Sequence, residues 1–221
     1  MYEDPRYRAV ILGALLHDIG KLLQRGSFGS IDIRGQHPQV SADFVSAFRD
    51  FFGRWVDSDL LRTLVQRHHE NSQRFPRALL AQETPNPEER ALALLVSKAD
   101  NLSSSERGKA ADQYQDFRRV PLSSIFRELQ GDGAPPAVAN LRARGFTIPA
   151  SLKGTFPDTF TEYPNGELTG HIQEFGQAFH EFQASFTGSF PALLSRLLNL
   201  LHRFGHCIPA NTQEEAPDVS L

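Results

Sequence analysis

Hydrophobic positions recur at helical spacing along most of this chain, and polar or glycine-rich stretches separate the segments that contain them. Apolar side chains at every third or fourth position form the buried face of a helix. Capping residues, a proline at the first helical position and a glycine after the last turn mark the boundaries. In the first half of the chain these signals predict helices over about 4–26, 37–52, 60–69 and 86–102.

The second half of the chain contains a polar stretch followed by two more helices. Residues 106–167 are polar and interrupted by glycine and proline, which predicts short strands and turns. Hydrophobic periodicity returns over about 168–187 and about 190–204. We therefore expect a mostly α protein with a core over 1–105, an irregular insertion or linker over 106–167, a helical pair over 168–210 that completes the bundle, and a flexible tail over 211–221.

Composition and charge limit the class of partner. The formal net charge of −3 over 221 residues argues against a surface that binds nucleic acid everywhere, so such binding needs a local basic patch or bound cations. Cys207 is the only cysteine, which excludes a disulfide framework and a zinc site made of thiolates. No apolar stretch is long enough to span a membrane, and the first residues do not form a secretory signal. We expect a soluble cytoplasmic protein with no membrane contact.

Six polar residues are the candidates for chemistry. Each lies within or at the end of a predicted helix whose other residues are apolar, so the helices bring these side chains into one core; they are His17, Asp18, His37, His68, His69 and Asp100. A buried carboxylate is costly unless it is paired or binds a metal. Imidazoles and carboxylates together suit transition metals better than the all-oxygen sites of Mg or Ca. We predict a divalent metal site, with Mn, Ni or Co as the expected ion and Mg or Zn as alternatives.

Asp18 and Lys21 are the predicted catalytic residues. The forked carboxylate of Asp18 can bridge two cations roughly 3.5–4 Å apart, and such a pair clamps a phosphodiester and generates the attacking hydroxide. Lys21 lies one turn after His17 on the same predicted helix face. Its ammonium group could hold a non-bridging phosphate oxygen. Gly20 leaves room for another backbone or a substrate to approach.

Three of the metal candidates have competing interpretations. Asp100 could pair with Lys98 or Arg107, but its position after a buried run favours metal binding. Adjacent side chains on a helix point in different directions, so His68 and His69 are not both expected to reach the metal. We favour His69 because it lies nearer the predicted helix end.

The remaining charged and histidine clusters are weaker signals. Four arginines surround the His-His pair and form either a solvated basic face or a track that guides a DNA backbone; they are Arg62, Arg67, Arg74 and Arg77. His202 and His206 have the i, i+4 spacing of a metal pair, but we favour capping of a helix C-terminus. His171 and His180 are predicted to lie at the surface.

Four segments together resemble one known family. They are His-Asp-Ile-Gly-Lys within 14–21, His-Pro-Gln-Val-Ser within 37–44, Arg-His-His-Glu over 67–70, and 96–107. These segments are similar to the HD nuclease domain of the large subunit of type III-A CRISPR effector complexes, and the resemblance continues to 217–221. It favours His37 as a ligand rather than as a simple helix start, because Ser41 and Phe44 follow it as in the family. The resemblance implies a permuted HD-domain helical bundle with its metal-site core in residues 1–105.

The resemblance also implies an activity and partners. In that family the domain cleaves single-stranded DNA with divalent metal, and it precedes palm domains that make cyclic oligoadenylates from ATP. The implied partners are single-stranded DNA, the palm domains of the same full-length subunit and the other subunits of the ribonucleoprotein complex. The palm domains are absent from this sequence, so we expect an isolated N-terminal part of that subunit.

The resemblance implies one complete and one incomplete ion site. HD enzymes of the ordinary arrangement have a further histidine before the His-Asp pair, and residues 1–16 contain none. In the permuted family that histidine follows the segment resembling 218–221, where this sequence stops. The complete site would use Asp18, His37, His68 and His69. The incomplete site would use His17, Asp18 and Asp100, and we expect it to be weakly occupied.

Three functions remain open from the sequence. The leading hypothesis is a metal-dependent endonuclease or exonuclease domain that cleaves single-stranded DNA in type III-A CRISPR antiviral defence. The second is an HD-type nucleotide phosphohydrolase, which needs a closed pocket that the glycine-rich stretch over 26–36 does not indicate. The third is a scaffold domain of the CRISPR complex with a weak site, which exposed apolar residues over 190–204 would support.

Overall fold

Helices make up most of the chain described by this computed structural model, which covers residues 2–70, 73–103, 116–123, 141–143, 158–159 and 166–210. The predicted mostly α fold is confirmed. The α-helices are α1 (Pro5–Leu16), α2 (Ile19–Leu23), α3 (His37–Ala47), α4 (Arg49–Phe52), α5 (Ser58–Gln66), α6 (Pro87–Ser103), α8 (Glu167–Ser185) and α9 (Phe190–Gly205). Two short 3-10 helices, η1 (Arg77–Leu79) and η2 (Ala81–Glu83), lie between α5 and α6.

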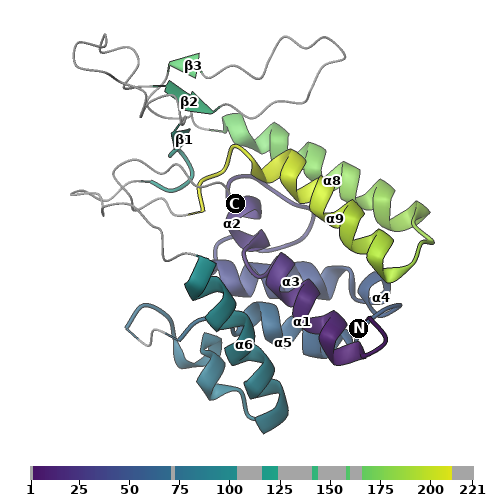
Figure 1. The fold of residues 1–221 in the computed structure, drawn as a ribbon. Helices are drawn as coiled ribbons and strands as arrows, with labels where there is room; N and C mark the ends of the chain where they lie inside the picture. Colours follow the sequence, from purple (N-terminus) through teal and green to yellow (C-terminus); the bar gives the residue numbers. More distant parts are fainter. Residues whose placement is uncertain are drawn as a thin grey trace, which may run out of the picture.

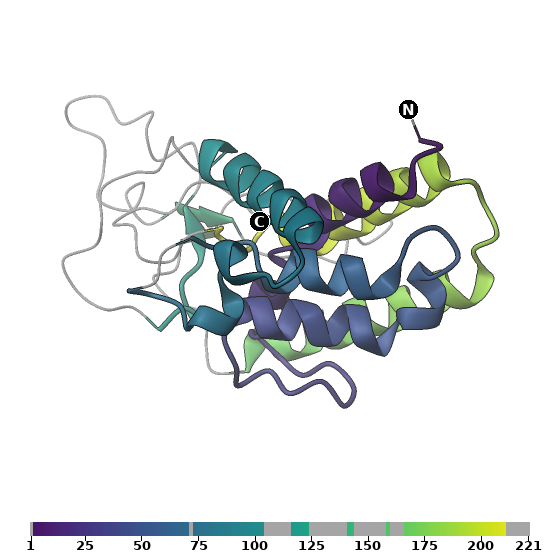
Figure 2. The same cartoon turned by 90° about the horizontal axis from the view of Figure 1, so that it is seen from below.

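The helices form a bundle in which α1, α2 and α3 occupy the middle. Helix α3 packs on α2 and α5, and α1 packs on α5 and α6. Helices α8 and α9 lie side by side on the other side of this middle group (Figure 1). The view from below shows α9 running alongside α1 (Figure 2). Residues from both halves of the chain therefore build one bundle.

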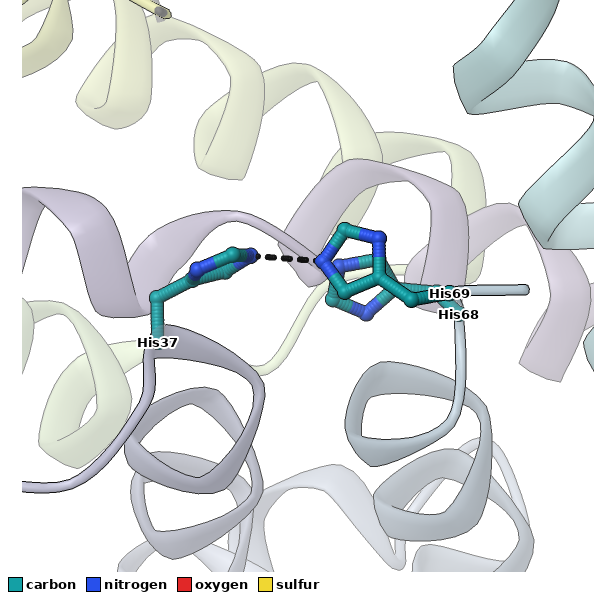
Figure 3. A group of neighbouring side chains, drawn as sticks. All are labelled: His37, His68 and His69. Atoms are coloured by element: carbon teal, nitrogen blue, oxygen red, sulfur yellow. Dashed lines mark hydrogen bonds between the residues drawn. The ribbon is translucent and has the colours of Figure 1, made fainter. Parts of the chain in front are cut away.

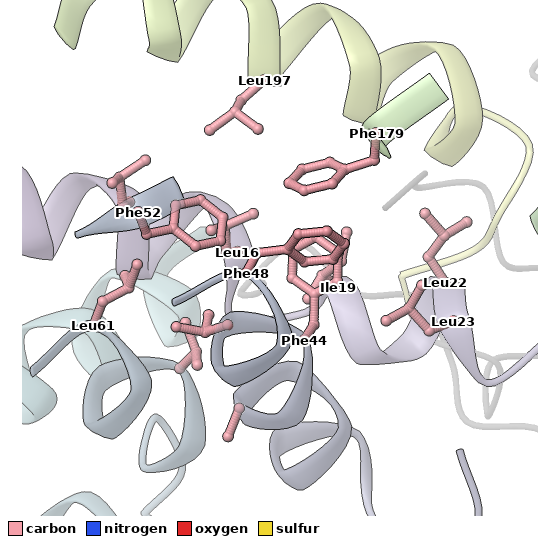
Figure 4. Close-up of a cluster of buried hydrophobic side chains, with 14 of the residues drawn as sticks. Leu16, Ile19, Leu22, Leu23, Phe44, Phe48, Phe52, Leu61, Phe179 and Leu197 are labelled. Atoms are coloured by element: carbon pink, nitrogen blue, oxygen red, sulfur yellow. The ribbon is translucent and has the colours of Figure 1, made fainter. Parts of the chain in front are cut away.

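A cluster of buried hydrophobic side chains joins the last two helices to the first five, and phenylalanines of α3, α4 and α8 form part of it (Figure 4). The ring of Phe179 in α8 lies 4.8 Å from that of Phe44 in α3 and 4.5 Å from that of Phe48, between centroids. Phe44 and Phe179 are almost completely buried. Each buried aromatic side chain removes a large apolar area from water. This core fixes α3, which carries His37 at its first position.

The predicted single helix over 4–26 is wrong, because a turn at His17 and Asp18 separates α1 from α2. The backbone of Asp18 leaves the helical range, with φ −99° and ψ 6°. Tertiary contacts with α3 explain the break. Ser41 donates to the carbonyl oxygen of His17 and accepts from the Gly20 N–H. A Cβ at Gly20 would lie 2.1 Å from the carbonyl oxygen of His37, so only glycine allows this approach.

The other predicted helices agree with the structure to different extents. The helix predicted over 37–52 is divided at Phe48 into α3 and α4. The helix predicted over 60–69 ends earlier, at Gln66, because Arg67 adopts φ −117° and ψ 51°. The start of α6 is confirmed, since the side chain of Asn86 accepts from two N–H groups of its first turn. The predicted helices over 168–187 and 190–204 are confirmed as α8 and α9.

The polar stretch over 106–167 contains short strands, as predicted. Strands β1 (Leu122–Ser123), β2 (Leu141–Ala143) and β3 (Asp158–Thr159) form an antiparallel sheet in the order β1-β2-β3. The other residues of that stretch and the predicted flexible tail over 211–221 lie outside the described residues. Within the described part of the chain, no helix has the length and hydropathy needed to cross a membrane.

Candidate metal centre

The six predicted metal ligands converge around the carboxylate of Asp18. Four histidine rings and the Asp100 carboxylate reach this point from the α1–α2 turn, the start of α3, the segment after α5 and the end of α6. The His17 Nε2 lies 3.3 Å from Asp18 Oδ2 and 3.5 Å from Asp100 Oδ1. On the other carboxylate oxygen of Asp18, Oδ1, the Nε2 atoms of His37 and His68 lie at 3.2 and 3.9 Å. The structure therefore brings together all six residues that the sequence singled out.

The two adjacent histidines both point into the centre. His68 and His69 follow the end of α5 rather than belonging to it, so the helical divergence expected for them does not occur. Figure 3 shows both rings facing His37, with the Nε2 atoms of His69 and His37 3.0 Å apart. His68 is the more deeply placed of the pair, because its side chain is completely buried. The preference for His69 over His68 has no support in this geometry.

The rings of His17 and His68 are held in one orientation by the backbone. His17 Nδ1 lies 2.8 Å from the carbonyl oxygen of Ala14, and His68 Nδ1 lies 2.8 Å from that of Val65. A carbonyl oxygen only accepts, so Nδ1 carries the proton in both rings. The neutral form of each ring then has its lone pair on Nε2, facing Asp18. Metal-binding histidines use this arrangement to fix the tautomer and the direction of the ring.

Three buried polar atoms at the centre have no hydrogen-bond partner among the described residues: His17 Nε2, Asp18 Oδ1 and His68 Nε2. Their close approaches do not have hydrogen-bond geometry. Buried polar atoms without partners are costly. A divalent cation would satisfy all three, and the donor set of imidazoles and carboxylates suits Mn, Fe, Co, Ni or Zn. The donor atoms form two groups, His37–His68–His69 and His17–Asp18–His68, each with all its donors within 4.8 Å of one another. The residues present therefore fit a centre for divalent metal.

Comparison with known proteins agrees with this geometry. The family model described as HD domain matches residues 4–105, which include the whole centre. Residues 4–105 are an HD domain. HD domains are typically metal-dependent phosphohydrolases, so the match and the His/Asp cluster together support a metal-dependent hydrolase.

One curated relative resembles the chain beyond the HD domain. It is the CRISPR system single-strand-specific deoxyribonuclease Cas10/Csm1 (subtype III-A) of Methanocaldococcus jannaschii, which is 26% identical over 234 aligned residues. The alignment covers 97% of this chain and 26% of the relative, so the chain spans about a quarter of the length of that protein. This similarity is consistent with the HD domain of such a subunit.

Without a cation, the HD domain holds opposite charges at one side of the centre. Burial alone would lower the pKa of His17, but the charge of Asp18 and the close approach of the Asp18 and Asp100 carboxylates to Nε2 overcome it and raise that pKa to about 10. Burial opposes ionisation of Asp18, yet the charges of Lys21 and His17 hold its pKa well below the usual range. The pKa of Asp100 is also lowered against the effect of burial, mainly by the His17 ring, whose Nε2 lies 3.5 Å from Asp100 Oδ1.

The three histidines on the other side of the HD domain's centre stay neutral. Burial lowers the pKa of His37. Burial and the charge of His17 lower the pKa of His68 to about 3. Burial and the neighbouring His68 lower the pKa of His69 to about 2. Neutral imidazole is the form that binds a metal, so these rings are ready for one at neutral pH.

Lys21 lies at the centre but contacts protein groups there. Its Nζ donates to Asp18 Oδ2 at 2.6 Å and to the carbonyl oxygen of Ala210 at 3.1 Å. The first contact holds the Asp18 carboxylate in place. The second ties the segment after α9 to the metal centre. No sequence signal pointed to the Ala210 contact, because any residue type supplies a carbonyl oxygen.

The arginines near the His-His pair differ in what they contact. Arg67 donates to the carbonyl oxygen of Glu83, and Arg77 donates to the Glu83 carboxylate at 2.9 and 3.0 Å. Arg74 is exposed and lies over the ring of Phe75, 5.7 Å from its centroid. Arg62 donates to side chains of α3 and α5 rather than facing the centre. Arg74 thus contacts Phe75, whose ring stacks on His69 in the HD centre. The sequence did not single out Phe75.

The histidines of the last two helices are not part of the centre. His206 Nδ1 lies 2.9–3.1 Å from the carbonyl oxygens of His202 and Arg203, which favours the predicted capping role. His180 is exposed, as predicted. The surface position predicted for His171 is wrong. Its ring is partly buried and bonds through Nε2 to the carbonyl oxygen of Phe204, because α8 and α9 pack together there.

Proposed function

We propose that this HD domain is a divalent-metal-dependent nuclease that cleaves single-stranded DNA in type III-A CRISPR antiviral defence. The observation that carries the proposal is the convergence of the bare, buried ring nitrogens of His17 and His68 on Asp18. The similarity of nearly the whole chain to a single-strand-specific deoxyribonuclease of a CRISPR system supports the choice of substrate and setting.

In this proposal the six residues hold two divalent cations, with Mn, Ni or Co as the expected metals. Asp18 would contribute one carboxylate oxygen to each side, since its Oδ2 faces His17 while its Oδ1 faces His37 and His68. Asp100 extends the His17 side, and His69 extends the His37 side. When bound, such cations polarise a phosphodiester and lower the pKa of water.

Lys21 contributes to phosphate binding in this proposal. An ammonium group has three donors, and the contacts with Asp18 and Ala210 use two of them. The third can donate to a non-bridging oxygen of the scissile phosphate. Charge-assisted hydrogen bonds contribute about 1.5–3 kcal/mol. Loss of Lys21 in Lys21→Ala is therefore expected to slow cleavage roughly 10- to 100-fold.

Two exposed arginines that follow the His-His pair in the sequence, Arg74 and Arg77, supply the contact with the DNA backbone in this proposal. Arg74 is exposed and has no carboxylate partner among the described residues. The ion pair of Arg77 with Glu83 is solvent-exposed, and such pairs contribute little, so a phosphate can compete for this side chain. Arg67 is partly buried and donates to the carbonyl oxygen of Glu83, so it is a weaker candidate for binding a DNA phosphate. Contacts of this kind follow the backbone and carry no base preference.

The test compares the wild-type chain with Asp18→Ala and with the control Asp50→Ala, which removes an exposed carboxylate from α4. Each is incubated with single-stranded DNA, duplex DNA, RNA and nucleotides in Mn, Ni, Co or Mg. The proposal predicts cleavage of single-stranded DNA by the wild type and the control, and none by Asp18→Ala or in the presence of a chelator. Cleavage that survives in Asp18→Ala contradicts it.

Nucleotide hydrolysis without DNA cleavage would favour the alternative phosphohydrolase. The described part of the chain offers no clear support for that function. A cavity of about 770 Å³ lies between the loop after α2, residues 116–119 and the start of α8. None of the six metal-ligand candidates lines it. A nucleotide bound there would be separated from the centre.

A scaffold role is the second candidate function, and one observation favours it. Leu198 on α9 is 57% exposed, and the sequence predicted exposed apolar residues on this helix. Such a side chain suits contact with another protein surface. If no metal supports cleavage of any substrate by the wild-type chain, the nuclease proposal fails and the scaffold role remains.

A further inference from the structure

We infer that Phe75 is a positioning residue that orients His69 and His37 for one of the two cations, an inference that rests on the proposed metal centre. Phe75 is 8% exposed, and its ring stacks on that of His69 with centroids 3.9 Å apart and an interplanar angle of 12°. The same ring meets His37 edge-on, at 5.8 Å and 85°. One aromatic side chain thus contacts two of the imidazoles at the centre.

These two imidazoles lack the backbone restraint that the other two have. In the described part of the chain, His17 and His68 each bond through Nδ1 to a carbonyl oxygen three residues earlier, whereas no Nδ1 contact holds His37 or His69. Their ring nitrogens instead face each other, with the two Nε2 atoms 3.0 Å apart. That hydrogen bond needs a proton on one Nε2, and a cation bound by both atoms removes it. Stacking against Phe75 remains when the cation binds.

A separate small hydrophobic cluster supports Phe75. It consists of Phe75, Leu79 and Leu80, and it is distinct from the main core. The Ala81 N–H donates to the carbonyl oxygen of His69 at 2.8 Å, and a β-bridge joins His69 to Leu80. The backbone of His69 is therefore fixed to this cluster, and Phe75 fixes the remaining rotation of the ring.

The contacts of Phe75 are selective for one side of the centre. Among the ring pairs of the described residues, Phe75 contacts His37 and His69 but neither His17 nor His68. His37 and His69 belong to one group of metal-binding donors, and His17 and Asp18 belong to the other. Loss of the stack should therefore weaken one cation site and leave the other unchanged. Residues that orient metal ligands typically change metal affinity 10- to 100-fold when they are replaced.

The experiment measures Mn²⁺ binding to the full chain by calorimetry, without substrate. Phe75→Leu keeps an apolar side chain but removes the stack, Phe75→Tyr keeps the ring, and Leu79→Ala disturbs the same small cluster without removing a ring. We expect Phe75→Leu to weaken one of two binding events 10- to 100-fold. Phe75→Tyr and Leu79→Ala should keep both near their wild-type affinities. Urea unfolding of each variant identifies any that is not folded.

The outcomes separate this inference from the proposed function. If the wild type and Phe75→Leu bind both ions equally well, the inference fails while the metal centre stands. If Leu79→Ala weakens the same event as much as Phe75→Leu does, Phe75 acts only through general stability and the inference also fails. If Phe75→Leu does not fold, Phe75→Tyr and Phe75→Met are compared instead. Near-normal Mn²⁺ affinity in Phe75→Tyr with weakened affinity in Phe75→Met supports the inference. Equal affinity in the two variants overturns it. If the wild-type chain binds no divalent ion, both proposals fail.

Discussion

Ser41 Oγ donates a hydrogen bond to the carbonyl oxygen of His17 at 2.7 Å, so a side chain of α3 fixes the turn that carries His17 and Asp18. The same hydroxyl accepts from the Gly20 N–H at 2.9 Å, and Ser41 is completely buried. One serine therefore satisfies a carbonyl at the end of α1 and an amide at the start of α2. This pair of hydrogen bonds lets the helix break without leaving buried backbone groups unpaired.

Ser41→Ala should destabilise the protein by roughly 1–3 kcal/mol, because it leaves a buried carbonyl and a buried amide unsatisfied. Urea unfolding followed by the fluorescence of Trp55, the only tryptophan, measures the change. Ser46→Ala is the control, since the Ser46 hydroxyl bonds to a carbonyl oxygen of its own helix and the residue is exposed. Equal stability of the two variants would contradict the role assigned to Ser41.

Gly20→Ala should be strongly destabilising, because the new Cβ would lie 2.1 Å from the carbonyl oxygen of His37. The two backbones must separate to admit it, which also displaces His37 from Asp18. Gly170→Ala is the matched control: it also lies in a helix, and an added Cβ there meets nothing within 4 Å. Alanine favours a helix over glycine by about 0.8–1 kcal/mol, so this control should unfold at a slightly higher temperature. A Gly20→Ala protein as stable as the wild type would refute the close approach.

The metal-free protein should be most stable near neutral pH. His68 and His69 have pKa values of about 3 and 2 when folded, against 6.5 in the unfolded chain, so the unfolded chain binds more protons as the pH falls below 6.5. Each of these two histidines therefore lowers the free energy of unfolding by roughly 1 kcal/mol as the pH falls from about 6.5 to about 5.5. The pKa of His17 is raised to about 10, so its stabilising contribution is complete below pH 6.5 and is lost as the pH rises through 10.

The free energy of unfolding, measured in the presence of a chelator across this pH range, tests both the loss of stability at acidic pH and the loss at alkaline pH. His69→Gln should reduce the loss on the acidic side. A free energy of unfolding that rises steadily from about pH 5.5 to about pH 9 would contradict the charge states assigned to the centre.

The sequence was sufficient to predict the residues of the centre but not how they are held. His17, Asp18 and Asp100 stand out because polar side chains inside apolar helical patterns require a reason for burial. The rings of His17 and His68 are oriented by backbone atoms, the carbonyl oxygens of Ala14 and Val65. Backbone atoms are common to all residue types, so their roles depend on the three-dimensional structure.

The errors in the predicted fold have the same cause. Local periodicity extended helices through His17 and through His68, where the residues themselves are compatible with a helix. The chain leaves the helix at both places because contacts with distant residues replace the local hydrogen bonds. Ser41 does so at the first place. At the second, Leu80 and Ala81 pair with the backbone of His69. The packing of α8 on α3 through Phe179 is also a long-range property that no local pattern defines.

Anomalous diffraction from a crystal of this chain grown with Mn²⁺ tests the proposed metal centre directly. We expect peaks on both sides of the Asp18 carboxylate, roughly 3.5–4 Å apart. One should lie among His37, His68 and His69, and the other beside His17 and Asp100. A map with no peak within coordination distance of Asp18, or with manganese only at His202 and His206, would contradict it.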